Sequence, residues 1–181
     1  MNANSGIHRT QPPAAVIEAA LTELVALART TPDGCLVEVG VYQGGSAWYL
    51  SEICFEQRRA LYLYDTFTGI PYKDPVDSHK IGDFADTSWE RVSELFPTAH
   101  VIPGIFPASA IPMPPIAFAH LDCDQYRSVR ESAEYLAPRM VSKGVMWFDD
   151  SPCLEGAHQA VREVFGARVR TSLSGKHFVE F

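Results

Sequence analysis

The chain is poor in several features that whole classes of protein require. Its four cysteines include no Cys-x-x-Cys pair and are too few for a disulfide framework, so we expect reduced, mostly packing thiols in a cytoplasmic protein. No apolar run approaches the length of a membrane span, and the first residues lack the apolar core of a signal peptide. No run of lysine or arginine is present and the net charge is -7, which argues against a nucleic-acid partner.

What the chain does contain is the composition of a folded domain of ordinary size. It has 181 residues, of which 46% are hydrophobic and 20% are charged, so it can bury a sizeable core. Residues 1–12 are polar and lead into a Pro-Pro pair, which predicts an irregular tail, and helical spacing of apolar residues follows at 14–29. We therefore expect a tail and helix over residues 1–34 and one domain over residues 35–181.

Short apolar runs typical of buried strands alternate with segments of helical periodicity along this domain. The expected strands cover residues 35–40, 60–64, 100–102, 116–121 and 144–148, followed by a hairpin of 167–171 and 177–181. The expected helices of the domain cover residues 46–58, 87–96, 126–136 and 155–165, and Thr87 with Glu90 has the spacing of a capping box. This order predicts an α/β fold: a seven-stranded, mostly parallel sheet with helices on both faces and a terminal antiparallel hairpin.

Two of the expected strands end in paired acids, Asp122 and Asp124 after the fourth strand and Asp149 and Asp150 after the fifth. The carboxyl ends of parallel strands meet at one edge of the sheet, where open α/β sheets bind their ligands. Carboxylates gathered there would repel one another, and a hard divalent cation such as Mg2+ would relieve that repulsion. A solvated acidic cluster is the alternative, and capping of the next helix explains Asp124 but not all four acids.

A glycine-rich turn follows the first expected strand and opens the next helix. Glycines allow close approach of the backbone, and free N–H groups at a helix start attract anionic groups, so this segment predicts a ligand cradle. The dinucleotide pattern G-x-G-x-x-G is broken, because Tyr42 stands between Gly40 and Gly45 where a glycine is required. Glu38 on the strand is either an ion-paired core residue or a ligand-binding one, and we favour the second. Asp65 after the second strand suits ribose hydroxyls, although a solvated strand-end acid is also common.

Residues 68–86 form a long loop rich in glycine, proline and aspartate. Loops of this length in a compact domain are typical of lids or binding segments, and otherwise are merely mobile. His79 lies within the loop and could reach a substrate, but a single loop histidine is usually just exposed.

Four blocks in this order together resemble one known family. They are Glu38-Val39-Gly40-Val41 through Gly44-Gly45-Ser46, Asp65-Thr66-Phe67-Thr68-Gly69-Ile70-Pro71, His120-Leu121-Asp122-Cys123-Asp124-Gln125-Tyr126, and Asp149-Asp150. The chain resembles the macrocin-type (TylF/NovP-like) O-methyltransferases, which depend on S-adenosylmethionine and Mg2+ and act on sugar hydroxyls of antibiotics. The resemblance covers residues 35–165 and implies a Rossmann-like class I methyltransferase fold for the domain 35–181.

The resemblance also implies roles for individual residues. The cofactor S-adenosyl-L-methionine would be held by Glu38, Gly40, Val41, Tyr42, Gly45, Ser46, Asp65, Thr66 and Phe67. Asp122, Asp149 and Asp150 would bind Mg2+ or another divalent cation, and Asp124 would be the general base. The implied reaction transfers the methyl group to a hydroxyl of a small acceptor, a sugar or other vicinal diol of secondary metabolism.

Two other functions compete with this interpretation. An NAD-dependent oxidoreductase on a similar sheet is disfavoured by the missing second glycine and by the closing hairpin. A non-catalytic cofactor-binding or oligomerisation module is disfavoured by the four intact acids. We therefore expect a small hydroxylated acceptor as partner, with no nucleic acid and no membrane, and a homo-oligomer is left open.

Overall fold

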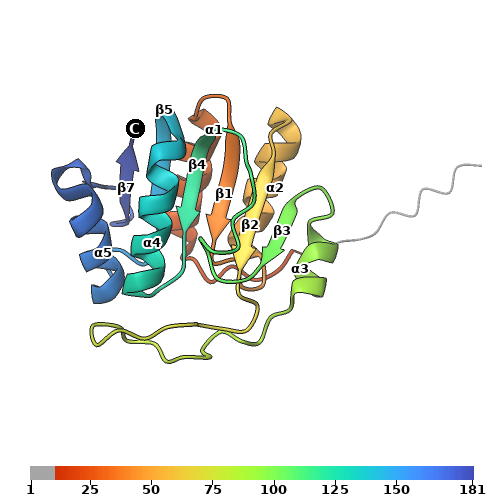
Figure 1. The fold of residues 1–181 in the computed structure, drawn as a ribbon. Helices are drawn as coiled ribbons and strands as arrows, with labels where there is room; N and C mark the ends of the chain where they lie inside the picture. Colours follow the sequence, from red (N-terminus) through yellow and green to blue (C-terminus); the bar gives the residue numbers. More distant parts are fainter. Residues whose placement is uncertain (1–10) are drawn as a thin grey trace, which may run out of the picture.

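The computed structural model describes residues 11–181, so the tail predicted for residues 1–12 lies outside the described residues up to position 10. The sheet has the strand order β3-β2-β1-β4-β5-β7-β6 (Figure 1). Its strands are β1 (Cys35–Val39), β2 (Leu61–Asp65), β3 (His100–Pro103), β4 (Ile116–Leu121), β5 (Met140–Phe148), β6 (Arg170–Thr171) and β7 (His177–Glu180). The first five strands are parallel, and β7 pairs antiparallel with β5 and with β6. The predicted sheet and its terminal hairpin are confirmed.

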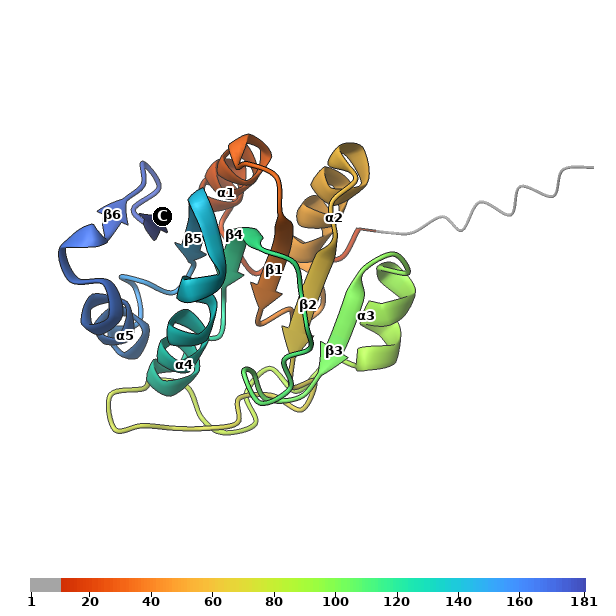
Figure 2. The ribbon, with the colours of Figure 1, turned by 45° about the horizontal axis from the view of Figure 1, so that its top comes forward.

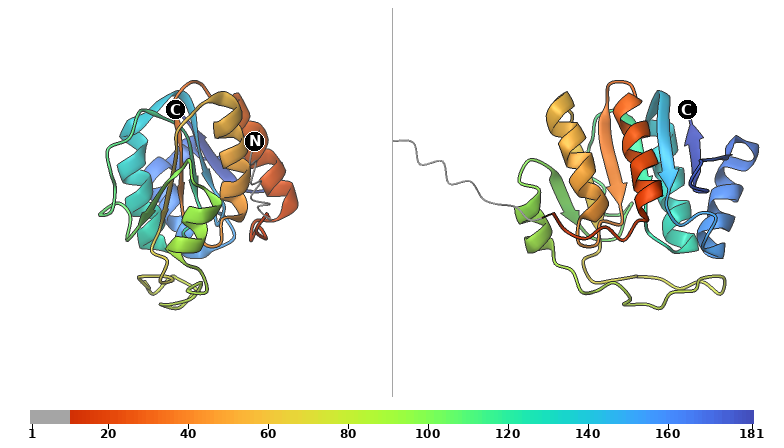
Figure 3. Two further views of the ribbon diagram at one scale, coloured as in Figure 1. Left: turned by 90° about the vertical axis from the view of Figure 1, so that its right-hand side faces the viewer. Right: turned by 180° about the vertical axis from the view of Figure 1, so that it is seen from behind.

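Helices cover both faces of this sheet, as predicted (Figure 3). The helices are α1 (Glu18–Thr30), α2 (Gly45–Gln57), α3 (Trp89–Leu95), α4 (Tyr126–Leu136) and α5 (Glu155–Phe165), with short 3-10 turns after α4 and α5. The helices α1 and α2 lie on one face, and α4 and α5 lie on the other. None of the helices in residues 11–181 is long and apolar enough to cross a membrane.

The predicted cap of α3 is wrong by one residue. Ser88, not Thr87, is the N-cap, because its extended backbone lets its hydroxyl accept the N–H of Arg91. The Thr87 hydroxyl instead donates to the carbonyl oxygen of Tyr42 in the glycine turn. The residue therefore connects the start of α3 to the turn after β1 rather than capping the helix.

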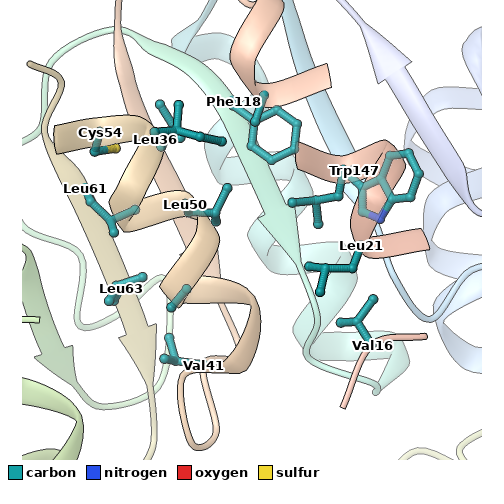
Figure 4. Close-up of a cluster of buried hydrophobic side chains, with 14 of the residues drawn as sticks. Val16, Leu21, Leu36, Val41, Leu50, Cys54, Leu61, Leu63, Phe118 and Trp147 are labelled. Atoms are coloured by element: carbon teal, nitrogen blue, oxygen red, sulfur yellow. The ribbon is translucent and has the colours of Figure 1, made fainter. Parts of the chain in front are cut away.

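Apolar layers on the two faces fix the central strands in place. All six residues of β4 are buried, as expected for a parallel strand with helices on both sides. On the α1/α2 face, Phe118 of β4 and Trp147 of β5 lie in one cluster with Leu21 of α1 (Figure 4). The strand β5 begins at Met140, earlier than predicted. The sequence prediction missed this start because the first four residues of the strand are partly exposed and lack the apolar signal. A rigid core thus holds the ends of β4 and β5 side by side.

A long segment, the strap (residues 66–88), crosses the carboxyl edge of the parallel strands between β2 and α3 (Figures 1 and 2). Asp77 is buried and fixes the strap: its Oδ1 accepts the N–H of Tyr126 at the start of α4, and its Oδ2 accepts the N–H of Asp74, both at 2.8 Å. Gln125 donates to the carbonyl oxygen of Tyr72 at 3.2 Å. The strap therefore lies over the edge where the sequence predicts a ligand site.

Candidate active site

The three predicted metal ligands meet at the carboxyl edge of the sheet. Asp122 follows β4, and Asp149 and Asp150 follow β5, whose last residue is paired with the last residue of β4. The Asp149 N–H donates to the carbonyl oxygen of Leu121 at 3.0 Å, which extends this pairing into the acidic residues. One carboxylate oxygen from each of the three acids lies within 4.8 Å of the others. The register of two neighbouring strands thus produces the cluster.

The side chain of Asp149 tests whether the cluster suits a cation. Its Oδ2 lies 3.1 Å from the Nζ of Lys176, which also donates to the carbonyl oxygen of Asp149. Its Oδ1 is buried and has no hydrogen-bond partner among the residues that the structure describes. A buried, unpaired carboxylate oxygen is costly in the absence of a ligand. Three converging carboxylates that leave such an oxygen free fit a hard divalent cation such as Mg2+.

Asp124 lies on a strained turn next to the three clustered acids Asp122, Asp149 and Asp150, called the triad below. Its backbone is left-handed, with φ 57°, and its N–H donates to Oδ2 of Asp150 at 2.8 Å. Its Oδ1 lies 3.5 Å from Nε2 of His79 in the strap, and the other ring nitrogen of His79 lies 3.8 Å from Asp83. The loop histidine therefore approaches the predicted general base instead of being merely exposed.

Burial and mutual repulsion raise the pKa values of these acids. Burial, followed by the charges of its neighbours, raises the pKa of Asp122 well above its usual value. The same causes raise the pKa of Asp124 to about 8. The pKa of Asp150 rises only to about 6, because the N–H of Asp124 opposes the effect of burial. Such a set of raised carboxyl pKa values in one cleft is typical of a functional site.

A cavity of about 310 Å³ joins the acidic cluster to the glycine turn. Four of the nine predicted cofactor residues line it: Gly40, Tyr42, Asp65 and Thr66. The four predicted catalytic and metal-binding acids line it as well. The volume falls at the lower end of the range of small-molecule sites, and the cavity is enclosed in part by the strap.

Two further predicted cofactor residues, Val41 and Phe67, do not line the cavity. Val41 and Phe67 are buried, and their N–H groups, with that of Tyr42, donate to the Asp65 carboxylate at 2.8 Å each. Oδ2 of Asp65 therefore ties the glycine turn to the end of β2, and Oδ1 holds the segment that follows β2. Asp65 contributes to the cavity wall, while Val41 and Phe67 hold that wall in shape.

Glu38 and Ser46 form a separate buried group. The Glu38 side chain is fully buried, accepts the hydroxyl of Ser46 at 2.5 Å and contacts Nδ1 of His120 at 2.7 Å. Glu38 thus has partners within the core, as in the core alternative that the sequence left open for it. Gly45 is also absent from the cavity lining, and it packs against the backbone of the segment before α1, where a Cβ on it would lie 2.3 Å from Cα of Ala14. Direct cofactor contact by these three residues stays a prediction.

Gly40 brings the two halves of the cavity together. Its φ is +90°, and a Cβ on it would lie 1.8 Å from the carbonyl oxygen of Asp122. No side chain fits there, so the turn after β1 and the acidic turn after β4 approach each other only through a glycine. Tyr42 adopts φ 51° without being a glycine, and it reaches Oδ2 of Asp86 through its hydroxyl at 2.8 Å. The broken dinucleotide pattern therefore retains a left-handed turn.

Comparison with known families decides what kind of protein carries this cavity. The model of the macrocin O-methyltransferase (TylF) family matches residues 17–171. The chain belongs to the macrocin O-methyltransferase family. This match spans strands β1 to β6, the strap and all of the predicted site residues, and it confirms the resemblance seen in the sequence.

One curated relative of this macrocin-family chain is the 8-demethyl-8-(2,3-dimethoxy-alpha-L-rhamnosyl)-tetracenomycin-C 4'-O-methyltransferase of Streptomyces olivaceus. The two are 27% identical over 150 residues, which is 69% of this chain and 57% of the relative. The chain thus spans little more than half the length of that curated relative.

Solved structures support the fold assignment. The O-methyltransferase NovP aligns with a TM-score of 0.73 at 20% identity, covering 88% of this chain and 78% of that chain. The calicheamicin methyltransferase CalS11 aligns with a TM-score of 0.68 at 20% identity, covering 90% and 77%. The Rossmann-like class I methyltransferase fold predicted for this member of the macrocin family is therefore confirmed.

Sequence reasoning missed part of the cavity wall in this macrocin-family chain. Ile70 and Phe84 of the strap and Gly104, Ile105 and Phe106 after β3 also line it. The rule that ligands bind at strand ends could have pointed to the segment after β3. The length of the loop over residues 68–86 indicated a lid or binding segment, but no local signal identifies Ile70 and Phe84 individually, because their position depends on where the strap crosses the sheet edge.

Proposed function

We propose that the chain transfers the methyl group of S-adenosylmethionine to a hydroxyl of a small acceptor, a sugar or other vicinal diol of secondary metabolism. One observation carries the proposal: the acidic cluster, Asp124 and Asp65, the acid expected to bind ribose hydroxyls, all line one cavity. Family membership supports it, and so does the activity of the tetracenomycin relative, which is O-methylation of a rhamnosyl compound. A structure of a Bacillus cereus O-methyltransferase with S-adenosylhomocysteine, TM-score 0.57 and 16% identity, shares the fold.

The glycine turn and the end of β2 would hold the cofactor. S-adenosylmethionine, when bound, supplies a methyl group on a cationic sulfur that is already electrophilic. Asp65 and Thr66 line the cavity and would accept ribose hydroxyls, and Gly40 lines the same cavity without a side chain. Ile105 and Phe106 offer an apolar surface on the same side of the cavity, suited to the adenine ring.

The acidic edge would hold the acceptor. Asp122, Asp149 and Asp150 would bind a divalent cation, which when bound lowers the pKa of an acceptor hydroxyl. An oxygen of the Asp124 carboxylate would take the hydroxyl proton, since Asp124 lines the cavity beside the triad. The strap, with Phe84 in the cavity wall, would exclude water and orient the acceptor oxygen toward the methyl group.

Thermal melting with S-adenosylhomocysteine and, separately, with NAD tests the cofactor. A ligand at about 100 times its dissociation constant stabilises a fold by about 2.7 kcal/mol. We expect a clear rise in Tm with S-adenosylhomocysteine and none with NAD. A rise with NAD alone would overturn the proposal in favour of the oxidoreductase.

Turnover with and without metal tests the acceptor side. We expect methyl transfer from labelled S-adenosylmethionine to rhamnosyl glycosides in the presence of Mg2+, and its loss in excess EDTA. Undiminished transfer in EDTA would refute the metal role while leaving the methyltransferase assignment intact.

A further inference from the structure

A buried lysine from the far end of the chain reaches the acidic cluster. Lys176 precedes β7 in the terminal hairpin and is only 7% exposed, which is rare for a lysine. Its ammonium group donates to the backbone carbonyl of Asp149 and lies 3.1 Å from Oδ2 of the same residue. Within residues 11–181, no ion pair joins Lys176 to any acid other than Asp149.

The hairpin holds Lys176 firmly in this place. The N–H of Lys176 donates to the hydroxyl of Ser172 at 3.1 Å, and the N–H of Ser172 donates back to the Lys176 carbonyl at 2.8 Å. The tip of the hairpin is tied to α1, because the Glu23 carboxylate accepts the N–H groups of Leu173 and Ser174 at 2.9 and 2.7 Å. The lysine is therefore part of a fixed turn and not a mobile surface side chain.

As a consequence, the two carboxylate oxygens of Asp149 have different surroundings. Lys176 occupies Oδ2, whereas Oδ1 is buried without a partner among the described residues. One oxygen of Asp149 is thus held by the protein and the other is left for a ligand. The groups around a metal ligand commonly set its orientation in this way, and removing one typically weakens metal binding by about 10–100-fold.

We propose that Lys176 is a positioning residue for the metal site: it fixes Asp149 so that Oδ1 faces the oxygens of Asp122 and Asp150. The terminal hairpin is then a working part of the site and not only the closing edge of the sheet. The inference rests on the proposed metal role of the three acids.

Calorimetric titration of the full chain with MgCl2 tests the proposal without turnover. We expect Lys176→Met to bind Mg2+ about 10–100-fold more weakly than the wild type. Lys143→Met is the matched control, since Lys143 is an exposed lysine on the neighbouring strand β5, and it should bind Mg2+ with wild-type affinity. Binding of S-adenosylhomocysteine, measured on the same samples, should be unchanged in both variants and reports that the cavity is folded.

Lys176→Gln is a second variant, which removes the charge but keeps N–H donors, in case Lys176→Met does not fold. Lys176→Gln should also bind Mg2+ more weakly than the wild type, by a smaller factor than Lys176→Met. Wild-type Mg2+ affinity in either folded variant would overturn the proposal. A wild-type chain that binds S-adenosylhomocysteine but no Mg2+ would refute the metal role itself, and this inference with it.

Discussion

Asp124 is held more firmly than a surface carboxylate would be. Its left-handed backbone places its N–H on Asp150, and its side chain lies between the triad and His79. Four of the six non-glycine residues with positive φ in residues 11–181, namely Tyr42, Phe67, Phe84 and Asp124, lie in or next to the cavity. Backbone strain concentrated in this way is typical of functional sites.

The first prediction concerns Asp124, the proposed general base. Asp124→Asn keeps the shape of the side chain and removes its ability to take a proton, so kcat should fall by about 10²–10⁴-fold. The affinity for S-adenosylhomocysteine, measured by calorimetry, should stay within about a factor of two of the wild type, a bound we set because Asp65 and Gly40 are untouched. Asp33→Asn, at an exposed turn, is the control. A fully active Asp124→Asn enzyme would sink the assignment of Asp124 as base.

The second prediction follows from the raised pKa values. The folded-state pKa of Asp124 is raised from 3.8 to about 8, and that of Asp150 to about 6. Between these values and the unfolded value the native state binds more protons than the unfolded state, so stability is greatest at low pH in this window and falls as pH rises. The Tm of the metal-free chain should therefore decrease from about pH 5 to pH 8, by about 2–4 °C for each kcal/mol lost.

Two further melting series show whether the acids cause the decrease of Tm with pH. Asp124→Asn should flatten part of the decrease, because Asn does not titrate. Added Mg2+ should restore Tm most at pH 8, where the carboxylates are charged. A Tm that rises steadily from pH 5 to pH 8 in the absence of metal would contradict the prediction.

At the scale of single residues, the sequence predicted that the acids gather at one edge, but it did not predict which side chains contact them. Asp122, Asp149 and Asp150 were predictable because each directly follows an apolar strand, and neighbouring parallel strands end at one edge. Lys176 was not, since nothing near it in the sequence indicates that the hairpin brings it to Asp149. Likewise, the contact of His79 with Asp124 depends on the path of the strap and not on local pattern.

At the scale of elements, the strap depends on one buried acid. Asp77 binds the first N–H of α4 and the N–H of Asp74, and a Cβ on Gly156 of α5 would lie 2.2 Å from its Oδ1. It thus joins the strap to both helices of one face. Because the strap carries Phe84 to the cavity and His79 to Asp124, its attachment should affect binding of the acceptor more than binding of the cofactor.

The third prediction tests this attachment. Asp77→Ala leaves the N–H of Tyr126 without its partner, at a cost of about 1–3 kcal/mol. We expect a lower Tm, a rise of about tenfold or more in KM for the acceptor, and little change in the affinity for S-adenosylhomocysteine. Asp74→Ala is the matched control, because the hydrogen bonds between Asp74 and Asp77 use only the backbone of Asp74. Equal effects of both variants would show that the Asp77 carboxylate does not hold the strap.

Elements were predictable where burial leaves an apolar pattern. The strand β4 is buried throughout and was found to the residue, whereas the partly exposed start of β5 was missed. The strand β6 is only Arg170–Thr171, exposed and shorter than predicted, because it lies at the sheet edge with little apolar surface to bury. Thr87 and Ser88 are equally good caps by composition, and only the contact of Thr87 with Tyr42 decides between them.

At the scale of the whole molecule, the cavity lies where the strand order reverses. The chain runs outward from β1 through β2 to β3, then returns to place β4 on the other side of β1. The turns after β1 and β4 therefore leave the sheet in opposite directions and open a crevice between them. The proposed cofactor side and the acidic side of the cavity meet at this point, through Gly40 and the carbonyl of Asp122.

The fourth prediction tests that junction. Gly40→Ala adds a Cβ at 1.8 Å from the Asp122 carbonyl in a backbone with φ +90°, so the two turns must separate. Gly82→Ala is the matched control: its φ is +88°, but nothing lies within 4 Å of the added Cβ. The control should lose about 1–3 kcal/mol of unfolding free energy from backbone strain alone. Gly40→Ala should lose clearly more, measured by urea unfolding, and should weaken binding of both S-adenosylhomocysteine and Mg2+, because the displaced turns carry both halves of the cavity. Equal losses in the two variants, with both ligands still bound, would mean that the contact between the turns does not hold the cavity together.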